Sequence, residues 1–251
     1  WDLETVNCWK GGPAAFFADR LSRLLPEVPI RELGVNASEG TFAFPVSQTW
    51  PGGVLWVGGH LLEFLDSAGT AHWAWQLELG KQYRIVVSTS AGLWRYDMQD
   101  VVEVVGFCEQ TPLIRFVGKS GRFLNAVGER VTEAQVSQAL KDAGLDLVGF
   151  TVGITMGDIP SYVVAFEGEI DPSVVGEALD AGLTRLNVEY QSKRKSGRLG
   201  GPTAQTLSPG HYARLRRRTV AMGAPDGQIK DPIVACDDTE WKRVLDGSGS
   251  P

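Results

Sequence analysis

The chain has 251 residues, of which 43% are hydrophobic and 22% charged, and its formal net charge is -6. These values are typical of a folded globular protein, and they argue against a largely disordered chain or one built mainly to coat nucleic acid. No run approaches the roughly 18 uncharged apolar residues of a membrane span, and the start lacks a signal-peptide layout, so we expect a cytoplasmic protein. Three cysteines and three histidines lack the spacing of a zinc or redox motif.

The first half of the chain reads as one helix followed by a β-rich region. Apolar residues at helical spacing predict a helix over residues 14–25, which Pro26 ends. Short strand-like runs separated by glycine, proline or charged turns follow at residues 54–57, 61–65, 83–88, 101–106 and 113–117. The Gly-Lys-Ser-Gly sequence at residues 118–121 then predicts a hinge.

The second half alternates helices and strands. Thr132 can cap a helix that runs to about Ala143, and strands are predicted over residues 147–154 and 161–167. One long helix fits residues 172–195, and a final helix is predicted from Ser208 or Pro209 to about Met222. We therefore expect a mixed α/β protein of two domains, a β-rich one over residues 1–117 and a smaller α/β one over residues 118–251.

Two segments of the first half carry residue types suited to binding a nucleotide. Ser38 and Glu39 lie in a loop of small residues, where the hydroxyl can contact a phosphate and the carboxylate can hold Mg²⁺, although an exposed turn is the commoner explanation of such a loop. Asp100 directly precedes a predicted strand, and its two carboxylate oxygens can accept hydrogen bonds from both hydroxyls of a ribose. The plainer alternative is that Asp100 pairs with Arg95.

Two further segments lie beyond the predicted hinge. Residues 122–133 lead into the helix capped by Thr132, and the cap alone is a sufficient explanation for them. Near the C-terminus, the sequence Gly-Gln-Ile-Lys-Asp-Pro at residues 227–232 presents Lys230 on a glycine-led loop. A single loop lysine of this kind is ordinarily no more than solvated.

In this order and at these separations, the segments resemble the auxin-responsive acyl-acid amido synthetases. That family is a branch of the adenylate-forming superfamily, which includes acyl-CoA synthetases and firefly luciferase. The resemblance runs over nearly the whole chain, through HLLEFLD, LELGKQYRIVVSTSAGLWRYDMQDVVEVVGF, GERVTEAQV, LDAGLTRLNVEYQSKR and GQIKDP. The long central stretch is the most specific of these.

The resemblance implies a particular domain organisation. Residues 1–117 would be the end of a large domain that binds ATP and acid, and residues 118–251 a small mobile C-terminal domain. The family's phosphate loop, rich in serine, threonine and glycine, lies far upstream in its members and has no counterpart in this sequence. The resemblance therefore implies either the rear part of such an enzyme, incomplete by itself, or a degenerate relative.

The resemblance also implies roles for five residues. Ser38 and Glu39 match the family's nucleotide loop, in which the glutamate helps to hold Mg²⁺ on the phosphates of ATP. Asp100 matches the ribose-binding aspartate. Lys119 stands where the superfamily usually has an arginine that approaches the nucleotide, and Lys230 matches a late lysine that acts during adenylation.

Several positions depart from the family's pattern. Val35 and Ala37 stand where the nucleotide loop usually carries an aromatic residue and a serine. Gln99 replaces the usual glycine before the aspartate, and Asp97 replaces the basic residue that usually follows the tyrosine. Lys119 lacks the bidentate fork of an arginine.

The leading interpretation is an enzyme that joins a small carboxylic acid to ATP, giving acyl-adenylate and pyrophosphate, and then forms an amide with an amino acid or other amine. Thioester formation with coenzyme A is a neighbouring alternative. A non-catalytic module is a third, and nucleic-acid binding a fourth. The last rests on basic residues concentrated in two short patches, Lys193, Arg194, Lys195 and Arg198, then Arg214, Arg216, Arg217 and Arg218. Which acid and which amine are used cannot be read from the sequence.

Overall fold

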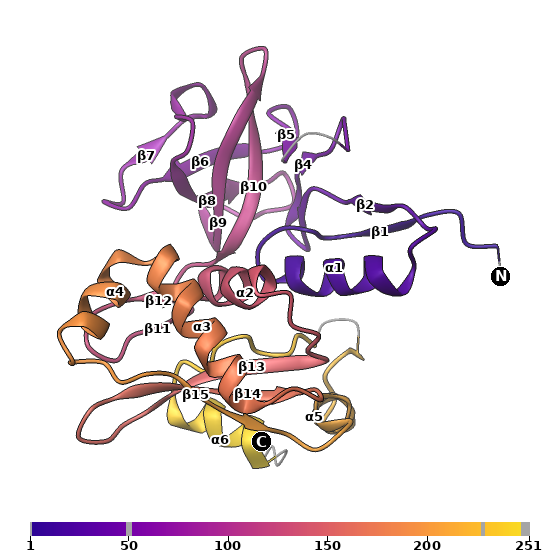
Figure 1. Ribbon diagram of the computed structural model, residues 1–251. Helices are drawn as coiled ribbons and strands as arrows, with labels where there is room; N and C mark the ends of the chain where they lie inside the picture. The colour runs from indigo at the N-terminus through magenta and orange to yellow at the C-terminus, as the bar shows by residue number, and fades with distance from the viewer. Residues whose placement is uncertain (1, 49–51, 227–228, 247–251) are drawn as a thin grey trace. The chain divides into compact units, whose positions relative to one another are not determined.

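A computed structural model describes residues 2–48, 52–226 and 229–246 (Figure 1). Residues 247–251, whose sequence Gly-Ser-Gly-Ser-Pro predicts a flexible tail, lie outside the described residues. The chain divides into two compact units, residues 1–121 and 122–251. No helix in the described parts of the chain is long and apolar enough to cross a membrane.

The first unit contains an eight-stranded antiparallel sheet in the order β3-β4-β5-β10-β9-β8-β6-β7. Its strands are β3 (Val35–Ala37), β4 (Gly40–Phe44), β5 (Gly53–Leu55), β6 (Leu61–Leu65), β7 (Ala71–His72), β8 (Gln82–Ser88), β9 (Tyr96–Cys108) and β10 (Thr111–Lys119). A short 3-10 helix, η1 (Ala74–Gln76), follows β7. The sequence predicted this β-rich region correctly, but three short strands, β3, β4 and β7, were missed, as was about half of the long strand β9.

Side-chain alternation along β9 places one face of this long strand in the core. Met98, Val102 and Val104 are buried, whereas the residues between them are less so, as expected for a strand with one covered face. Asp100 falls on the buried face and is only 7% exposed. A carboxylate in that position is costly unless it has a partner.

The remaining elements of the first unit are a helix and a parallel strand pair. Helix α1 (Ala14–Leu24) confirms the predicted helix and has Leu25 at its C-cap. Strands β1 (Val6–Cys8) and β2 (Ile30–Glu32) pair in parallel and were not predicted. A Cβ atom at Gly12 would lie 2.8 Å from the carbonyl oxygen of Val117, so the start of α1 depends on close approach to β10.

The second unit is built on the three-stranded sheet β13-β14-β15. Its elements are β11 (Phe123–Leu124), β12 (Val131–Thr132), α2 (Glu133–Asp142), β13 (Gly149–Thr155), β14 (Ser161–Glu167), α3 (Pro172–Leu186), α4 (Val188–Lys195), β15 (Thr203–Thr206), α5 (His211–Ala221) and α6 (Asp238–Asp246). Thr132 accepts a hydrogen bond from the backbone N–H of Gln135 at 3.3 Å, which confirms it as the cap of α2.

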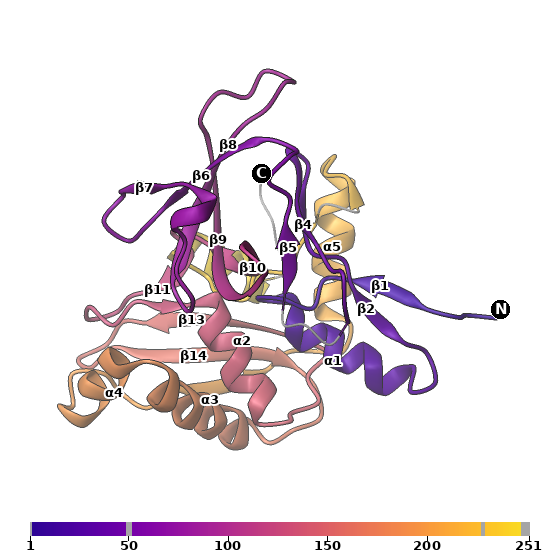
Figure 2. The same cartoon turned by 90° about the horizontal axis from the view of Figure 1, so that it is seen from above.

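Helices cover both faces of this sheet. On one face α2 packs against α3, where the Cβ of Ala139 leaves no room for a side chain at Gly182. On the other face, the rings of Tyr212 in α5 and Trp241 in α6 lie over Gly149 and Gly153, two positions four residues apart on β13. Figure 1 shows α2 and α3 on one side of the strands and α6 on the other, and Figure 2 shows α2 crossing over β13 and β14.

Two helix predictions in this unit were wrong. The single helix predicted over residues 172–195 is broken at Asn187, whose φ of -140° is extended and whose side chain accepts a hydrogen bond from Tyr190 N at 2.9 Å. Asn187 thus ends α3 and caps α4. The predicted final helix exists as α5, but α6 follows it and was missed.

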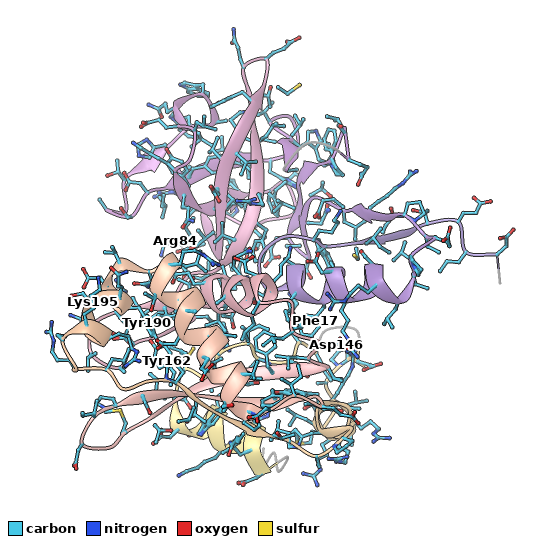
Figure 3. All side chains as sticks on the ribbon, in the orientation of Figure 1. Phe17, Arg84, Asp146, Tyr162, Tyr190 and Lys195 are labelled. Carbon is cyan, nitrogen blue, oxygen red and sulfur yellow. The ribbon has the colours of Figure 1, made fainter. Side chains whose placement is uncertain are left out.

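A buried polar network joins β14 to the α3–α4 pair. Tyr162 donates to the carboxylate of Glu129, and Tyr190 donates to Asp180 at 2.7 Å. The two tyrosine rings lie 5.7 Å apart, side by side in Figure 3. Burial, together with the neighbouring carboxylate, raises the pKa of both phenols well above the ordinary value.

These tyrosines predict that the second unit loses stability in alkali. Burial also raises the pKa of Tyr212, so three phenols stay protonated in the folded state above about pH 10 while those of the unfolded chain ionise. Stability contributed by a raised pKa is present below the unfolded value and falls as pH rises above it. Three such groups give a slope of up to about 4 kcal/mol per pH unit.

Hydrogen exchange of β13 and β14 between about pH 9 and pH 11 would measure this slope once the rates are corrected for intrinsic base catalysis. We expect Tyr190→Phe to lower the slope by about one third. Tyr96→Phe, which alters an exposed tyrosine of the first unit, is the control and should leave it unchanged. Stability that stays constant up to about pH 11 would contradict the prediction.

Candidate functional site

Asp100 and Lys119, both assigned to a nucleotide by the resemblance, lie directly opposite each other on β9 and β10. Lys119 Nζ is 2.7 Å from Asp100 Oδ1 and donates to the carbonyl oxygen of Met98 at 3.0 Å. The Asp100 side chain is 9% exposed and the Lys119 side chain 48% exposed. The alternative pairing of Asp100 with Arg95 is wrong, because Arg95 Nε donates to Glu63 at 2.8 Å.

The backbone just before Asp100 is held in an unusual conformation. Gln99 has a φ of 60°, in the left-handed region that costs a residue with a Cβ roughly 1–2 kcal/mol. This explains why glycine suits the position in the family's pattern. Ser120 stabilises the turn, since its backbone N–H donates to the Gln99 carbonyl at 2.6 Å and its hydroxyl donates to Gln99 Oε1. Asp97 Oδ1 accepts from Gln99 N at 3.0 Å.

The charge of Asp97 is also countered locally. Arg84 Nε lies 3.3 Å from Asp97 Oδ2. The departure from the family's pattern at this position therefore comes with its own cation, so the negative charge near the proposed ribose site is smaller than the sequence suggested.

Ser38 and Glu39 form the tight turn between β3 and β4, with Ala37 paired to Gly40. Ser38 is exposed and Glu39 is half-buried. In the sheet order, β4, β5 and β10 stand between β3 and β9, so this turn is not the neighbour of Asp100 in the sheet. The structure thus brings together Asp100 and Lys119 but does not join them to the Ser38–Glu39 turn by any hydrogen bond between described residues.

A protein-only metal site is not formed around Glu39. Within residues 2–48, 52–226 and 229–246, no group of three or more His, Cys, Asp or Glu side chains is arranged to hold a metal ion. Mg²⁺ is commonly held by one or two carboxylates together with the phosphates of the substrate. Glu39 alone fits that second arrangement, in which ATP supplies the other ligands.

Lys230 belongs to the second unit and is exposed, on a loop fixed on both sides. Beyond it, Thr151 Oγ1 donates to the carbonyl oxygen of Pro232 at 2.6 Å, and Val152 N donates to that of Ile233 at 2.9 Å. Before it, Arg216 Nε donates to Asp226 Oδ1 at 2.7 Å. Gly227 and Gln228 of the predicted motif lie outside the described residues. The loop therefore presents Lys230 from the edge of β13.

Arg122, a residue for which sequence reasoning gave no role, ties together three parts of the second unit. Its guanidinium donates to Glu133 at 2.7 Å, to Glu240 at 2.9 Å and to the carbonyl oxygen of Val234 at 2.7 Å. Burial opposes the charge, but the two glutamates outweigh it and raise the pKa of Arg122. Since Val234 follows the Lys230 loop, Arg122 helps to fix that loop.

Glu129 was also missed, although it is 2% exposed. Its carboxylate accepts from Ala126 N at 2.7 Å, from Val127 N at 2.8 Å and from the hydroxyl of Tyr162. It closes the turn that links β11 to β12 and thereby anchors the start of the second unit. A buried acid with this set of donors has a structural role.

The two basic patches are partly neutralised. Arg194 makes two 2.8 Å hydrogen bonds to Asp180, and Arg216 is held by Asp226. Lys193 Nζ lies 3.8 Å from Glu189. The patches therefore offer less free positive charge for nucleic acid than the number of basic residues suggested.

The fold is that of an acyl acid amido synthetase. The solved structure of the GH3.15 acyl acid amido synthetase superposes with a TM-score of 0.84 over 97% of this chain and 46% of that one, at 21% sequence identity. Residues 54–119 match the GH3 family central domain, and residues 129–239 match the GH3 family C-terminal domain. The chain belongs to the GH3 family, as the resemblance in the sequence predicted.

Curated relatives agree with this assignment. The chain is 29% identical over 171 residues to indole-3-acetic acid-amido synthetase GH3.5 of Arabidopsis thaliana. It is 27% identical over 168 residues to jasmonoyl--L-amino acid synthetase JAR4 of Nicotiana attenuata. Each alignment includes 62% of this chain but only 28% and 29% of the relative. The chain thus spans less than a third of the length of these relatives.

Proposed function

We propose that this chain forms the rear part of the active site of an ATP-dependent ligase that joins a carboxylic acid to an amine. In the first step a carboxylate oxygen attacks the α-phosphorus of ATP and pyrophosphate leaves. In the second step the amine attacks the acyl carbon, AMP leaves, and an amide forms with release of one proton. The observation that carries the proposal is the pairing of Asp100 with Lys119 inside a matched GH3 central domain.

The chemistry requires positive charge because two anions meet in the first step. Asp100 would accept hydrogen bonds from the ribose hydroxyls, and Lys119 would lie near the phosphate. Lys230, at the end of its flexible stem, would bridge the attacking carboxylate and the α-phosphate as a point charge. Glu39 would contribute one ligand to Mg²⁺ on the ATP phosphates, where the ion supplies charge neutralisation.

The substrate class follows from the names of the relatives, which act on indole-3-acetic acid or form jasmonoyl amino acids. We propose a small organic acid and an amino acid or other amine as the partners, in the cytoplasm. Formation of a coenzyme A thioester is the alternative that shares the first step, and the mass of the product separates the two. A non-catalytic role is favoured if no acid supports adenylation.

Carboxylate-dependent exchange of labelled pyrophosphate into ATP tests the first step directly. We expect none from the 251-residue chain alone, because its sequence contains no counterpart of the phosphate loop. Exchange should appear when the chain is joined behind the part of Arabidopsis GH3.5 that precedes the aligned region. A panel of aryl, indolyl and fatty acids with Mg²⁺ provides the substrates.

Asp100→Asn should abolish most of this exchange, whereas Glu109→Gln, at the exposed turn between β9 and β10, should leave it unchanged. A folded fusion that exchanges pyrophosphate with none of the acids would reject the proposed activity. Exchange by the 251-residue chain alone would instead reject the view that its half of the active site is insufficient.

A further inference from the structure

The carboxylate assigned to the ribose already has a partner. Lys119 Nζ lies 2.7 Å from Asp100 Oδ1, an oxygen that is buried and accepts no well-aligned hydrogen bond from the protein. The contact is therefore mainly electrostatic. A ribose that reaches this carboxylate must compete with the ammonium group for the same oxygen.

The two partners differ in their freedom to move. Asp100 is fixed on the buried face of β9, just after the left-handed Gln99 and its contacts with Ser120. Lys119 is the last residue of β10, and about half of its side chain is exposed. Its ammonium group sits on four flexible carbons, so it can leave Asp100 without any change in the strands.

We propose that Lys119 is an exchangeable partner of Asp100, which leaves the carboxylate when a nucleotide binds and moves to the phosphate. This inference rests on the proposed function, because it needs Asp100 as the ribose ligand. It adds a selection step to that function. AMP or ATP supplies a phosphate anion that replaces Asp100 as the partner of Lys119. Adenosine also displaces the ammonium group from Asp100, but it has no phosphate to serve as a new partner.

The consequence is opposite in sign for the two ligands. Without the ammonium group, adenosine no longer has to break an ion pair and should bind more tightly. AMP gains the same advantage at the ribose but loses the cation at its phosphate, where charge-assisted contacts are the stronger ones. Removal of Lys119 should therefore erase the preference for the phosphorylated ligand.

The experiment measures the affinity of the GH3.5 fusion for adenosine and for AMP by titration calorimetry, because the 251-residue chain contains no counterpart of the phosphate loop. The variants are Lys119→Met, which keeps the apolar stem, and Lys119→Arg, which keeps the charge. Lys81→Met is the matched control, because Lys81 forms a comparable 2.6 Å ion pair with Glu78 away from this site. Asp100→Asn tests the carboxylate itself.

We expect Lys119→Met to bind adenosine about three- to tenfold more tightly and AMP about three- to tenfold more weakly. Lys119→Arg should retain the preference for AMP, and Lys81→Met should change neither affinity. If Lys119→Met binds adenosine equally or more weakly while AMP binding still depends on Asp100, the proposed exchange of Lys119 is rejected and the proposed ribose site is not. AMP binding that is insensitive to Asp100→Asn would overturn the proposed ribose site, as would the absence of binding by every variant.

Discussion

Replacing Lys230 by alanine is expected to slow adenylation by about 10²-fold or more in the GH3.5 fusion, by comparison with the loss of one transition-state donor in other enzymes. The physical reason is that the attack of a carboxylate on a phosphate builds negative charge at the reacting centre. The ammonium group of Lys230 would be the mobile cation that balances it. Because the side chain is exposed, its removal should leave the fold and its stability unchanged.

The measurement is the rate of pyrophosphate exchange at saturating ATP, with the KM for ATP determined in parallel. A residue that acts in the transition state lowers kcat and leaves KM nearly constant. Lys242→Ala removes an exposed lysine of α6 in the same unit and is the control. A loss of less than about threefold for Lys230→Ala would remove this residue from the mechanism.

Sequence reasoning succeeded where one local pattern determines the structure. The helix of residues 14–24 follows from apolar spacing, and the start of α2 follows from the hydroxyl of Thr132. The prediction of one long helix failed at Asn187, because the residues on both sides of it favour a helix. The helix is interrupted there because the Asn187 side chain accepts a hydrogen bond from the backbone N–H of Tyr190. Helix α6 was missed because it is short and polar, with Val244 as its buried residue.

The candidate site was predictable in part for a related reason. A resemblance selects residues one by one, so it found Asp100 and Lys119 separately. Their contact depends on the register of β9 with β10. That register shifts between Phe116 and Gly118, and no pattern in the sequence predicts the shift. The partner of Asp97 is likewise fixed by pairing between strands, since Arg84 comes from β8.

Glu129 is the clearest example of a residue whose role cannot be predicted from the sequence around it. In the sequence it is an ordinary polar residue in a turn beside a glycine, and residues of its kind are mostly exposed. Its burial depends on Tyr162, which lies 33 residues further along the chain. Only the packing of β14 beneath the turn of residues 125–130 brings the phenol to the carboxylate, and no local pattern contains that information.

Glu129→Ala is expected to destabilise the second unit by about 3–5 kcal/mol. The substitution leaves two backbone N–H groups and the hydroxyl of Tyr162 without their acceptor in a buried site, and each unsatisfied donor costs about 1–3 kcal/mol. Hydrogen exchange followed by mass spectrometry is the suitable measurement, because it reports β13 and β14 separately from the sheet of the first unit.

Two further variants determine whether the carboxylate itself is responsible. Glu129→Gln keeps the shape and one acceptor oxygen but turns an amide N–H₂ toward a backbone donor, so its cost should fall between that of the alanine variant and zero. Glu169→Ala removes an exposed acid of the same unit and should change little. If Glu129→Ala lowers the free energy of unfolding by less than about 1 kcal/mol, water replaces the lost acceptor. Glu129 would then not be required to hold the turn between β11 and β12.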